Sequence, residues 1–234
     1  MGNRYSKIDM GNRREIVLLK SYPCAYGKCS FCNYIEDNTL DEELMENVNF
    51  ETLDEVTGEY SSLEVINSGS VFELPRTTME KIRETVKKKG IRTLYFEIYY
   101  GYHKRLDEIT SLFPGVEIRF RMGLETFDND FRVGVYNKNF RLEERELLEL
   151  GEKLFSVCLM ICTQGQTREM IQKDIELGLK YFRSITVNIF IDNGTPVKRD
   201  QELVKWFVEN YSYLREDSRV ELLIDNKDLG VFEQ

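Results

Sequence analysis

The chain has 234 residues, of which 41 are acidic and 32 basic, and its formal net charge is −9. A chain of this length buries roughly 70% of its unfolded surface, so it needs no disulfide framework to fold. No run of 18 apolar residues occurs, which argues against a membrane span. An acidic chain also matches nucleic acid poorly, because phosphates are bound by basic side chains. Without an apolar secretory signal at its N-terminus, the protein is expected to be cytoplasmic.

Residues 1–14 are expected to form a flexible N-terminal arm, and residues 15–234 a single domain, since no linker-like composition interrupts them. Short apolar runs there alternate with amphipathic stretches. The predicted strands are 15–20, 63–67, 93–99, 116–123, 156–163, 184–192 and 220–224. The predicted helices are 40–56, 77–90, 103–112, 142–155, 168–179 and 201–214. Thr39 is the candidate N-cap of the first helix, and Gly90 ends the second. This alternation predicts an α/β protein whose parallel strands are joined by outer helices.

Three of the predicted strands have one apolar face and one charged or aromatic face. The polar faces comprise Glu117, Arg119, Arg121 and Glu125 in the fourth strand, Tyr95, Glu97 and Tyr99 in the third, and Asn188, Phe190 and Asp192 in the sixth. A parallel strand that is covered on both sides is apolar nearly throughout. An exposed edge strand would explain one such pattern but not three. The pattern therefore favours a partial barrel with a polar lumen.

Three cysteines, Cys24, Cys29 and Cys32, follow the first predicted parallel strand within nine positions. The carboxyl ends of parallel strands are where such folds bind ligands. A structural zinc ion prefers a fourth protein ligand, and His103 is the chain's only histidine. An iron–sulfur cluster with three cysteine ligands and one open iron fits the count better. The remaining pair, Cys158 and Cys162, is expected to be buried in the core.

The loop "CAYGKCSFC" resembles the cluster loop of radical S-adenosylmethionine (radical SAM) enzymes, although four residues rather than three separate Cys24 from Cys29. The resemblance implies a partial (β/α)6 barrel. It also implies that Cys24, Cys29 and Cys32 ligate a [4Fe–4S] cluster, whose open iron binds the amino and carboxylate groups of S-adenosylmethionine. Phe31 would then pack near the adenine.

Two later stretches extend this resemblance. "NSGSVFE" is similar to the family's glycine-containing loop, in which Ser68 and Gly69 would meet the methionine amino group. "MGLETF" is similar to the stretch that reaches the ribose, with Glu125 as the acceptor of a hydroxyl. Arg121 or Arg119 would pair with the methionine carboxylate, which suits the fork of a guanidinium group.

The remaining candidates come from the predicted lumen. Asn188 is a further candidate for cofactor binding, and Glu97 is the candidate catalytic residue, although it could equally contact S-adenosylmethionine. Aromatic rings and carboxylates suit a flat, guanine-like heterocycle. The candidates for substrate contact are Tyr95, Glu97, Tyr99, Phe190, Asp192 and Asp225. The alternative is that the aromatic residues are core and that the acids pair with Arg119 or Arg121.

The short chain and the four-residue gap also resemble radical enzymes of bacterial queuine salvage. This likeness implies a lyase in which a 5′-deoxyadenosyl radical cleaves free queuine, or a related deazaguanine, to 7-aminomethyl-7-deazaguanine. An electron donor such as flavodoxin or ferredoxin is then expected. Two alternatives stay open: a radical SAM enzyme acting on another small metabolite or on tRNA, and a non-catalytic metal-binding interaction module.

Overall fold

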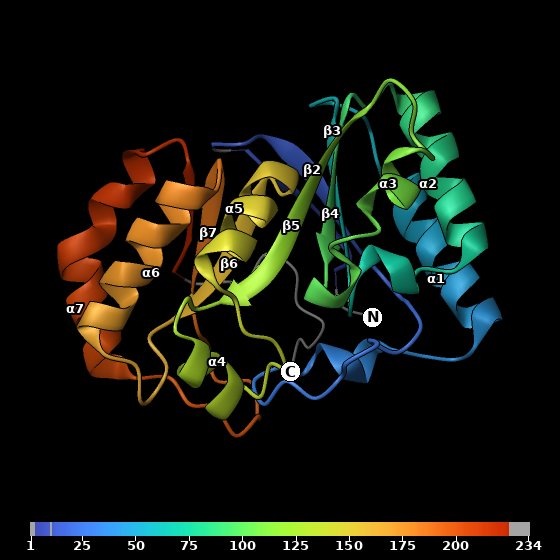
Figure 1. Ribbon diagram of the computed structural model, residues 1–234. Coiled ribbons are helices and arrows are strands. Elements are labelled where there is room, and N and C mark those ends of the chain that lie inside the picture. Colours follow the sequence, from blue (N-terminus) through green and yellow to red (C-terminus); the bar gives the residue numbers. More distant parts are fainter. Residues whose placement is uncertain (1–2, 10, 225–234) are drawn as a thin grey trace. The chain divides into compact units, whose positions relative to one another are not determined.

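The computed structural model describes residues 3–9 and 11–224. Strands and helices alternate along the chain (Figure 1). The strands are β1 (Tyr5–Ile8), β2 (Arg14–Leu19), β3 (Ser62–Asn67), β4 (Thr93–Ile98), β5 (Glu117–Glu125), β6 (Ser156–Ile161), β7 (Ser184–Ile189) and β8 (Val220–Leu223). The α-helices are α1 (Glu42–Asp54), α2 (Arg76–Lys89), α3 (Leu106–Thr110), α4 (Asn129–Gly134), α5 (Glu144–Lys153), α6 (Arg168–Tyr181) and α7 (Gln201–Tyr211). The 3₁₀ helices are η1 (Tyr34–Asp37), η2 (Val71–Glu73), η3 (Tyr100–Tyr102) and η4 (Ser212–Glu216).

The described chain divides into two compact units. Unit 1 takes in the described residues up to 27 and residues 34–120, and unit 2 takes in residues 28–33 and 121–224. In unit 1, β2, β3 and β4 are parallel and follow chain order. In unit 2, β5, β6, β7 and β8 are likewise parallel and in chain order. The parallel α/β arrangement is therefore confirmed, while a single domain over residues 15–234 stays a prediction.

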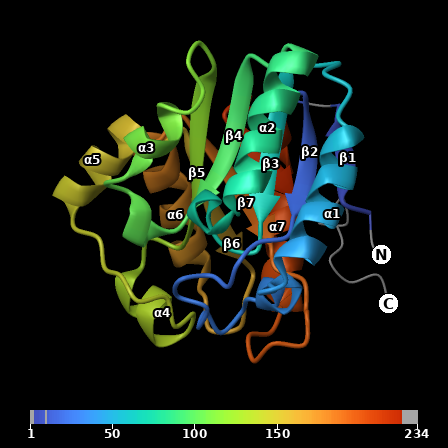
Figure 2. The same ribbon diagram turned by 90° about the vertical axis from the view of Figure 1, so that its right-hand side faces the viewer.

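Helices α1 and α2 of unit 1 pack against each other, and Figure 2 shows both on the same side of β2, β3 and β4. Ile82 and Val86 are buried on the inner side of α2, which ends at Gly90 in the left-handed conformation (φ 66°), as predicted. The N-cap of α1 differs from the prediction. Asp41, not Thr39, accepts the capping hydrogen bond, because the helix begins at Glu42.

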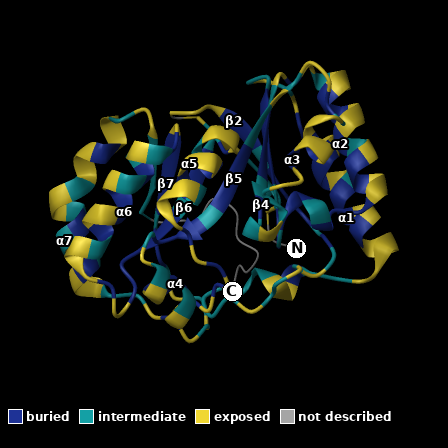
Figure 3. Ribbon diagram, in the orientation of Figure 1, coloured by how far each residue is buried: buried dark blue, intermediate teal, exposed yellow. Residues whose placement is uncertain are grey.

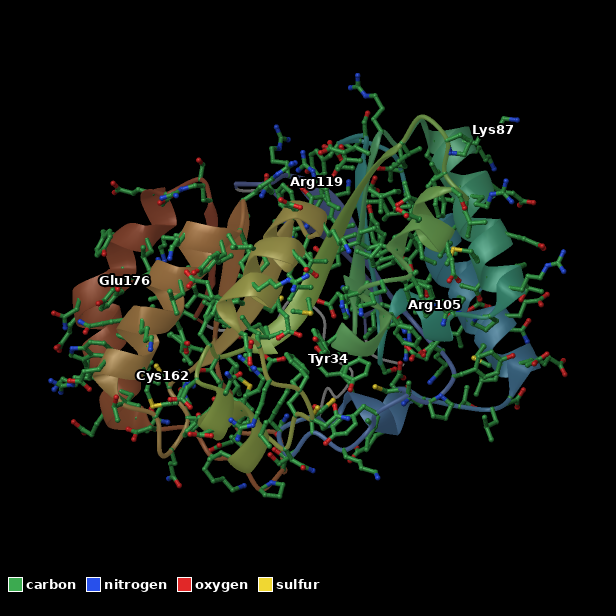
Figure 4. The ribbon with its side chains drawn as sticks, viewed as in Figure 1. Tyr34, Lys87, Arg105, Arg119, Cys162 and Glu176 are labelled. Carbon is green, nitrogen blue, oxygen red and sulfur yellow. The ribbon has the colours of Figure 1, made fainter. Side chains whose placement is uncertain are left out.

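Helix α6 of unit 2 packs on β6 and β7. Glu176 lies on its exposed side (Figure 4), whereas Ile175 is buried. Gly178 permits the close approach, since a Cβ at this position would lie 2.7 Å from Cγ2 of Ile185. Figure 3 shows the same division, with largely buried strands and helices exposed along one side. Among residues 3–9 and 11–224, no helix is long and apolar enough to cross a membrane.

The N-terminal segment differs from the flexible arm that the sequence predicts over residues 1–14. Tyr5–Ile8 forms β1, which pairs antiparallel with β2. Arg4 donates to the carbonyl oxygen of Leu18 over 3.0 Å and forms an ion pair with the buried Asp37. The prediction of a flexible arm is therefore wrong for Tyr5–Ile8, because the edge of β2 offers these residues a hydrogen-bonding partner.

Candidate active site

In unit 1, Cys24 lies against the loop that follows β3. The carboxylate of Glu73 joins the two loops, since it accepts hydrogen bonds from the backbone N–H of Ala25 (3.2 Å) and of Ser70 (2.5 Å). A Cβ at Gly69 would lie 2.9 Å from Oε2 of Glu73 and 3.4 Å from Cα and Cβ of Cys24. Only glycine allows this approach without displacing a neighbour. The loop predicted to bind the cofactor therefore does lie beside the first cysteine.

Glu73 is a site residue that the sequence reasoning did not identify. Burial raises the pKa of its carboxyl group, although hydrogen bonds from Ser70 and Tyr102 oppose that effect. Burial and the charge of Glu73 in turn raise the pKa of Tyr102 to about 12. The signal was present as the "SVFE" capping box, in which Ser70 and Glu73 bond reciprocally.

An aromatic row extends from the cysteine loop within unit 1. Tyr26 stacks on Tyr99 with ring centroids 5.9 Å apart, and Tyr99 meets Tyr102 edge to face at 6.4 Å. Tyr102 stacks on Phe72 at 4.6 Å, and the guanidinium of Arg105 lies 4.8 Å from the Phe72 ring centroid (Figure 4). Tyr99, a predicted substrate contact, is therefore joined to the segment that carries Cys24.

The other candidates on β4 have a different environment. Tyr95 is 3% exposed, and its hydroxyl accepts a hydrogen bond from Nη1 of Arg119 over 2.5 Å. The guanidinium groups of Arg14 and Arg119 lie 5.5 and 5.3 Å from its ring centroid, and Arg119 also pairs with Glu117 at 2.8 Å. These contacts favour the alternative in which Tyr95 is core, but the acid that pairs with Arg119 is Glu117, which was not among the candidate substrate contacts. Glu97, two residues along β4, is half-buried, and its catalytic role stays a prediction.

Cys29 and Cys32 lie in unit 2, in the short segment 28–33. The backbone N–H of Cys32 donates to the carbonyl oxygen of Cys29 over 3.2 Å, which bends the segment into a turn. Ser30 is bonded to the chain that follows α4, because its N–H donates to the carbonyl oxygen of Tyr136 over 3.0 Å. Both cysteines are half-buried. Their thiols are thus held on a fixed backbone within reach of solvent.

Phe31 lies between these cysteines and packs against a core cluster of unit 2. The cluster consists of Phe131, Tyr136, Met160, Phe190 and Val197. Phe31 meets the Tyr136 ring edge to face at 5.3 Å, and its carbonyl oxygen accepts from Nδ2 of Asn193 over 2.9 Å. Phe190, a predicted substrate contact, is 4% exposed within this cluster. Its packing argues for a core role, and the substrate role stays a prediction.

Glu125, the predicted ribose acceptor, ends β5 with a φ of 68° and is 8% exposed. Its carboxylate pairs with Lys138 (Oε1–Nζ 2.6 Å), and Lys138 also donates to the carbonyl oxygen of Gly123 over 2.6 Å. Burial by itself lowers the pKa of Lys138, but the charges of Glu125, Cys29 and Cys32 outweigh it and the pKa is raised. No motif in the sequence marks Lys138.

The arginine predicted to bind the methionine carboxylate has a carboxylate partner within unit 2. Nη2 of Arg121 lies 2.8 Å from Oε2 of Glu221 and contacts the Thr186 hydroxyl, and Arg121 is 6% exposed. S-adenosylmethionine would therefore share this guanidinium group with Glu221 or displace Glu221 from it. The cofactor role of Arg121 stays a prediction.

The last candidates lie on and after β7. Asn188 is half-buried, and its buried Oδ1 has no hydrogen-bond partner among the described residues. A buried unsatisfied oxygen of this kind is what a ligand donor would complete. Asp192 is exposed, and its carboxylate accepts a hydrogen bond from the backbone N–H of Arg199 over 2.8 Å, which stabilises the loop between them. Asp225 lies outside the described residues.

The donor set of the cysteine loop fits an iron–sulfur cluster better than zinc. Cys24, Cys29 and Cys32 form no disulfide, and soft thiolates are the usual cluster ligands. Within residues 3–9 and 11–224, no three His, Cys, Asp or Glu side chains are already gathered as a metal-binding group. Nδ1 of His103 lies 2.6 Å from the carbonyl oxygen of Tyr100, in hydrogen-bonding range. The three cysteines therefore remain a predicted ligand set.

The two remaining cysteines differ in burial. Cys162, labelled in Figure 4, follows β6 directly and is buried, and burial raises its thiol pKa to about 12. The prediction of a core thiol is thus confirmed for Cys162. Cys158 on β6 is half-buried.

The parallel strands, their outer helices and the three-cysteine loop together define the class of the protein, a radical SAM partial barrel. No protein-family model matches the sequence, and no curated protein does. Among solved structures, queuine lyase from Clostridium spiroforme bound to SAM and queuine is 46% identical. The match covers 98% of this chain and 100% of that one, with a TM-score of 0.94. The chain belongs to the queuine lyase family, and the predicted fold class is confirmed.

Proposed function

We propose that this protein is a radical SAM lyase that cleaves free queuine to 7-aminomethyl-7-deazaguanine. The observation that carries the proposal is the 46% identity, over nearly all of both chains, to a queuine lyase bound to SAM and queuine. The loop with Cys24, Cys29 and Cys32 supports it independently, because it supplies the thiol ligands that such chemistry requires.

In this proposal the three cysteines hold a [4Fe–4S] cluster. When bound, the cluster supplies one electron to S-adenosylmethionine, which yields methionine and the 5′-deoxyadenosyl radical that removes hydrogen from queuine. Gly69 keeps the β3 loop close to Cys24, and Glu73 ties the two loops together. Glu125 accepts a hydrogen bond from a ribose hydroxyl, and its ion pair with Lys138 fixes the position of its carboxylate.

The substrate would be held by side chains that offer a stacking face or a carboxylate. Tyr99 belongs to an aromatic row and is half-buried, and Glu97 is half-buried on the same strand. An aromatic face stacks on the deazaguanine ring, and a carboxylate accepts its N–H groups.

A turnover experiment tests the proposal. The reconstituted protein is incubated without oxygen with S-adenosylmethionine, dithionite and free queuine, and the products are read by mass spectrometry. We expect 5′-deoxyadenosine and 7-aminomethyl-7-deazaguanine to form together. If only 5′-deoxyadenosine forms, and its formation does not depend on queuine, the substrate assignment is contradicted and another small metabolite becomes the candidate.

A tRNA substrate is tested in parallel with queuosine-containing tRNA. Binding to tRNA weakens steeply with salt, because counterions are released from the phosphates, whereas binding of a free base does not. Because its net charge is −9, the chain should bind tRNA poorly, and we expect no product from queuosine-containing tRNA. A cytoplasmic location and reduction by a flavodoxin or ferredoxin are further parts of the proposal.

Replacement of one cysteine distinguishes the enzyme from a metal-binding interaction module. We expect Cys29→Ala to abolish cluster assembly and leave the fold intact, because the core is large enough to fold without metal. Cys158→Ala is the matched control and should keep about four irons per chain. Iron analysis and far-ultraviolet circular dichroism check both variants. Wild-type iron content in Cys29→Ala would remove Cys29 from the ligand set.

A further inference from the structure

Lys138 is the one buried lysine within the part of the chain that the structure describes, with 7% of its surface exposed. A buried ammonium group is costly unless hydrogen bonds and an opposite charge compensate it. Here Nζ donates to Oε1 of Glu125 and to the carbonyl oxygen of Gly123, each over 2.6 Å. The charge is thus retained in the interior of unit 2.

The segment that carries Lys138 is attached to the cysteine loop. The N–H of Ser30 donates to the carbonyl oxygen of Tyr136 over 3.0 Å, and Oγ of Ser30 donates to that of Val135 over 2.5 Å. Nδ2 of Asn137 donates to the carbonyl oxygen of Lys28 over 2.7 Å. These three hydrogen bonds fix residues 135–137 against residues 28–30. Lys138 is therefore held beside the loop by the backbone, not only by its own side chain.

The ammonium group faces the cysteine loop. Nζ of Lys138 lies 5.7 Å from the ring centroid of Phe31, the residue just before Cys32. Negative charge on Cys29 and on Cys32 raises the pKa of Lys138. A positive charge in this position favours negative charge on the cysteine loop.

We propose that the buried positive charge of Lys138 raises the reduction potential of the cluster that Cys29 and Cys32 help to hold. The inference rests on the proposed function, since it requires the cluster. On reduction, one electron passes from the donor to the cluster while the thiolate ligands stay bound, so negative charge at the site increases by one. A buried positive charge beside the two sulfur atoms favours the reduced form, because little water screens it.

Glu125 has the opposite effect on the cluster. Its carboxylate pairs with Lys138 and offsets part of the positive charge. The two residues therefore predict shifts of opposite sign. Removing the charge of Lys138 lowers the potential, and removing the charge of Glu125 raises it. General damage to the packing would not produce this pair of opposite shifts.

The test is the midpoint potential of the reconstituted cluster, measured without oxygen and without S-adenosylmethionine by spectroscopic titration with a graded reductant. We expect Lys138→Met to lower the potential by about 59 mV or more, the equivalent of a tenfold change in a one-electron equilibrium. Glu125→Gln should raise it, and Lys138→Arg should restore a near wild-type value. Lys28→Met removes an exposed lysine next to Cys29 and should shift the potential far less, because solvent screens that charge.

The outcomes separate this inference from the proposed function. A wild-type protein that assembles no cluster would refute the proposed function itself. If the wild type assembles its cluster, an unchanged potential in Lys138→Met would overturn the inference alone. Shifts of the same sign in Lys138→Met and Glu125→Gln would also overturn it. If Lys138→Met does not fold, the sign of the shift in Glu125→Gln decides.

Discussion

At the scale of single residues, a buried acid orders the loop that follows Glu125. Asp174 of α6 is 1% exposed and accepts hydrogen bonds from the N–H of Phe127 (2.6 Å) and the hydroxyl of Thr126 (3.0 Å). Nη2 of Arg132 donates to the carbonyl oxygen of Thr126 over 2.6 Å. Burial raises the pKa of Asp174 to about 7, and the same cause lowers that of Arg132 to about 10. The loop after β5 is thus held by side chains whose charged forms are disfavoured by burial in the folded protein.

This cost makes stability depend on pH. Folded Asp174 keeps its proton up to about pH 7, while the unfolded chain releases it near the ordinary value of 3.8. The free energy of unfolding should therefore decrease as pH rises between these values, by on the order of 4 kcal/mol in total. Asp174→Asn removes this dependence. Urea unfolding from pH 5 to pH 8 should show the wild type losing stability relative to the variant, and a pH-independent difference would contradict the assignment.

Gly69 offers a test of the contact between the two cofactor loops. Gly69→Ala would place a Cβ 2.9 Å from the Glu73 carboxylate, which Ser70 and Ala25 hold in place. We expect a loss of about 1–3 kcal/mol in unfolding free energy and less iron retained after reconstitution. Gly134→Ala is the matched control, because a Cβ there meets nothing within 4 Å. Equal iron content in both variants would argue against a fitted loop beside Cys24.

At the scale of elements, β1 and the residue before it are integrated into unit 1. The strand adds an antiparallel edge to β2, and the Arg4–Asp37 pair joins it to η1, which follows the cysteine loop in sequence. Lys20 binds the same carboxylate at 2.8 Å. The N-terminal segment therefore stabilises the part of unit 1 that comes directly after the cysteines in the chain.

Two substitutions compare a buried and an exposed pair in this segment. Arg4→Ala leaves Asp37 buried with one basic partner fewer, and we expect a loss of about 1–3 kcal/mol in unfolding free energy. Lys7→Ala breaks the solvent-exposed pair with Glu59 and should cost much less, because exposed ion pairs contribute little to stability. Urea unfolding measures both. Equal losses would mean that the two ion pairs contribute alike and that burial of Asp37 does not make its pair with Arg4 more stabilising.

At the scale of the whole molecule, local patterns predicted the fold well because each helix and each strand has its own periodicity. The expected strands from β2 to β8 are all present, with ends shifted by a few residues. β1 was missed because a short edge strand forms only when a partner strand is available. The five-residue helix α3 is shorter than the predicted 103–112, and α4 was not predicted at all, since helices of one or two turns carry too little periodicity.

The site was predictable where one loop carries the chemistry and not where distant residues meet. The three-cysteine loop resembles that of radical SAM enzymes, and this resemblance pointed to the class of enzyme. Lys138 and Asp174 escaped notice because their partners lie far away in sequence. Phe190 was assigned to the substrate from strand alternation alone; the structure packs it in a core cluster, and its substrate role stays a prediction.

The most direct measurement of the central claim uses queuine deuterated in its cyclopentenediol ring. The reconstituted protein turns it over without oxygen, and mass spectrometry reads the 5′-deoxyadenosine that forms. If a radical from S-adenosylmethionine removes hydrogen from queuine itself, the 5′-deoxyadenosine gains deuterium while 7-aminomethyl-7-deazaguanine appears. Formation of the deazaguanine product with unlabelled 5′-deoxyadenosine would contradict the account.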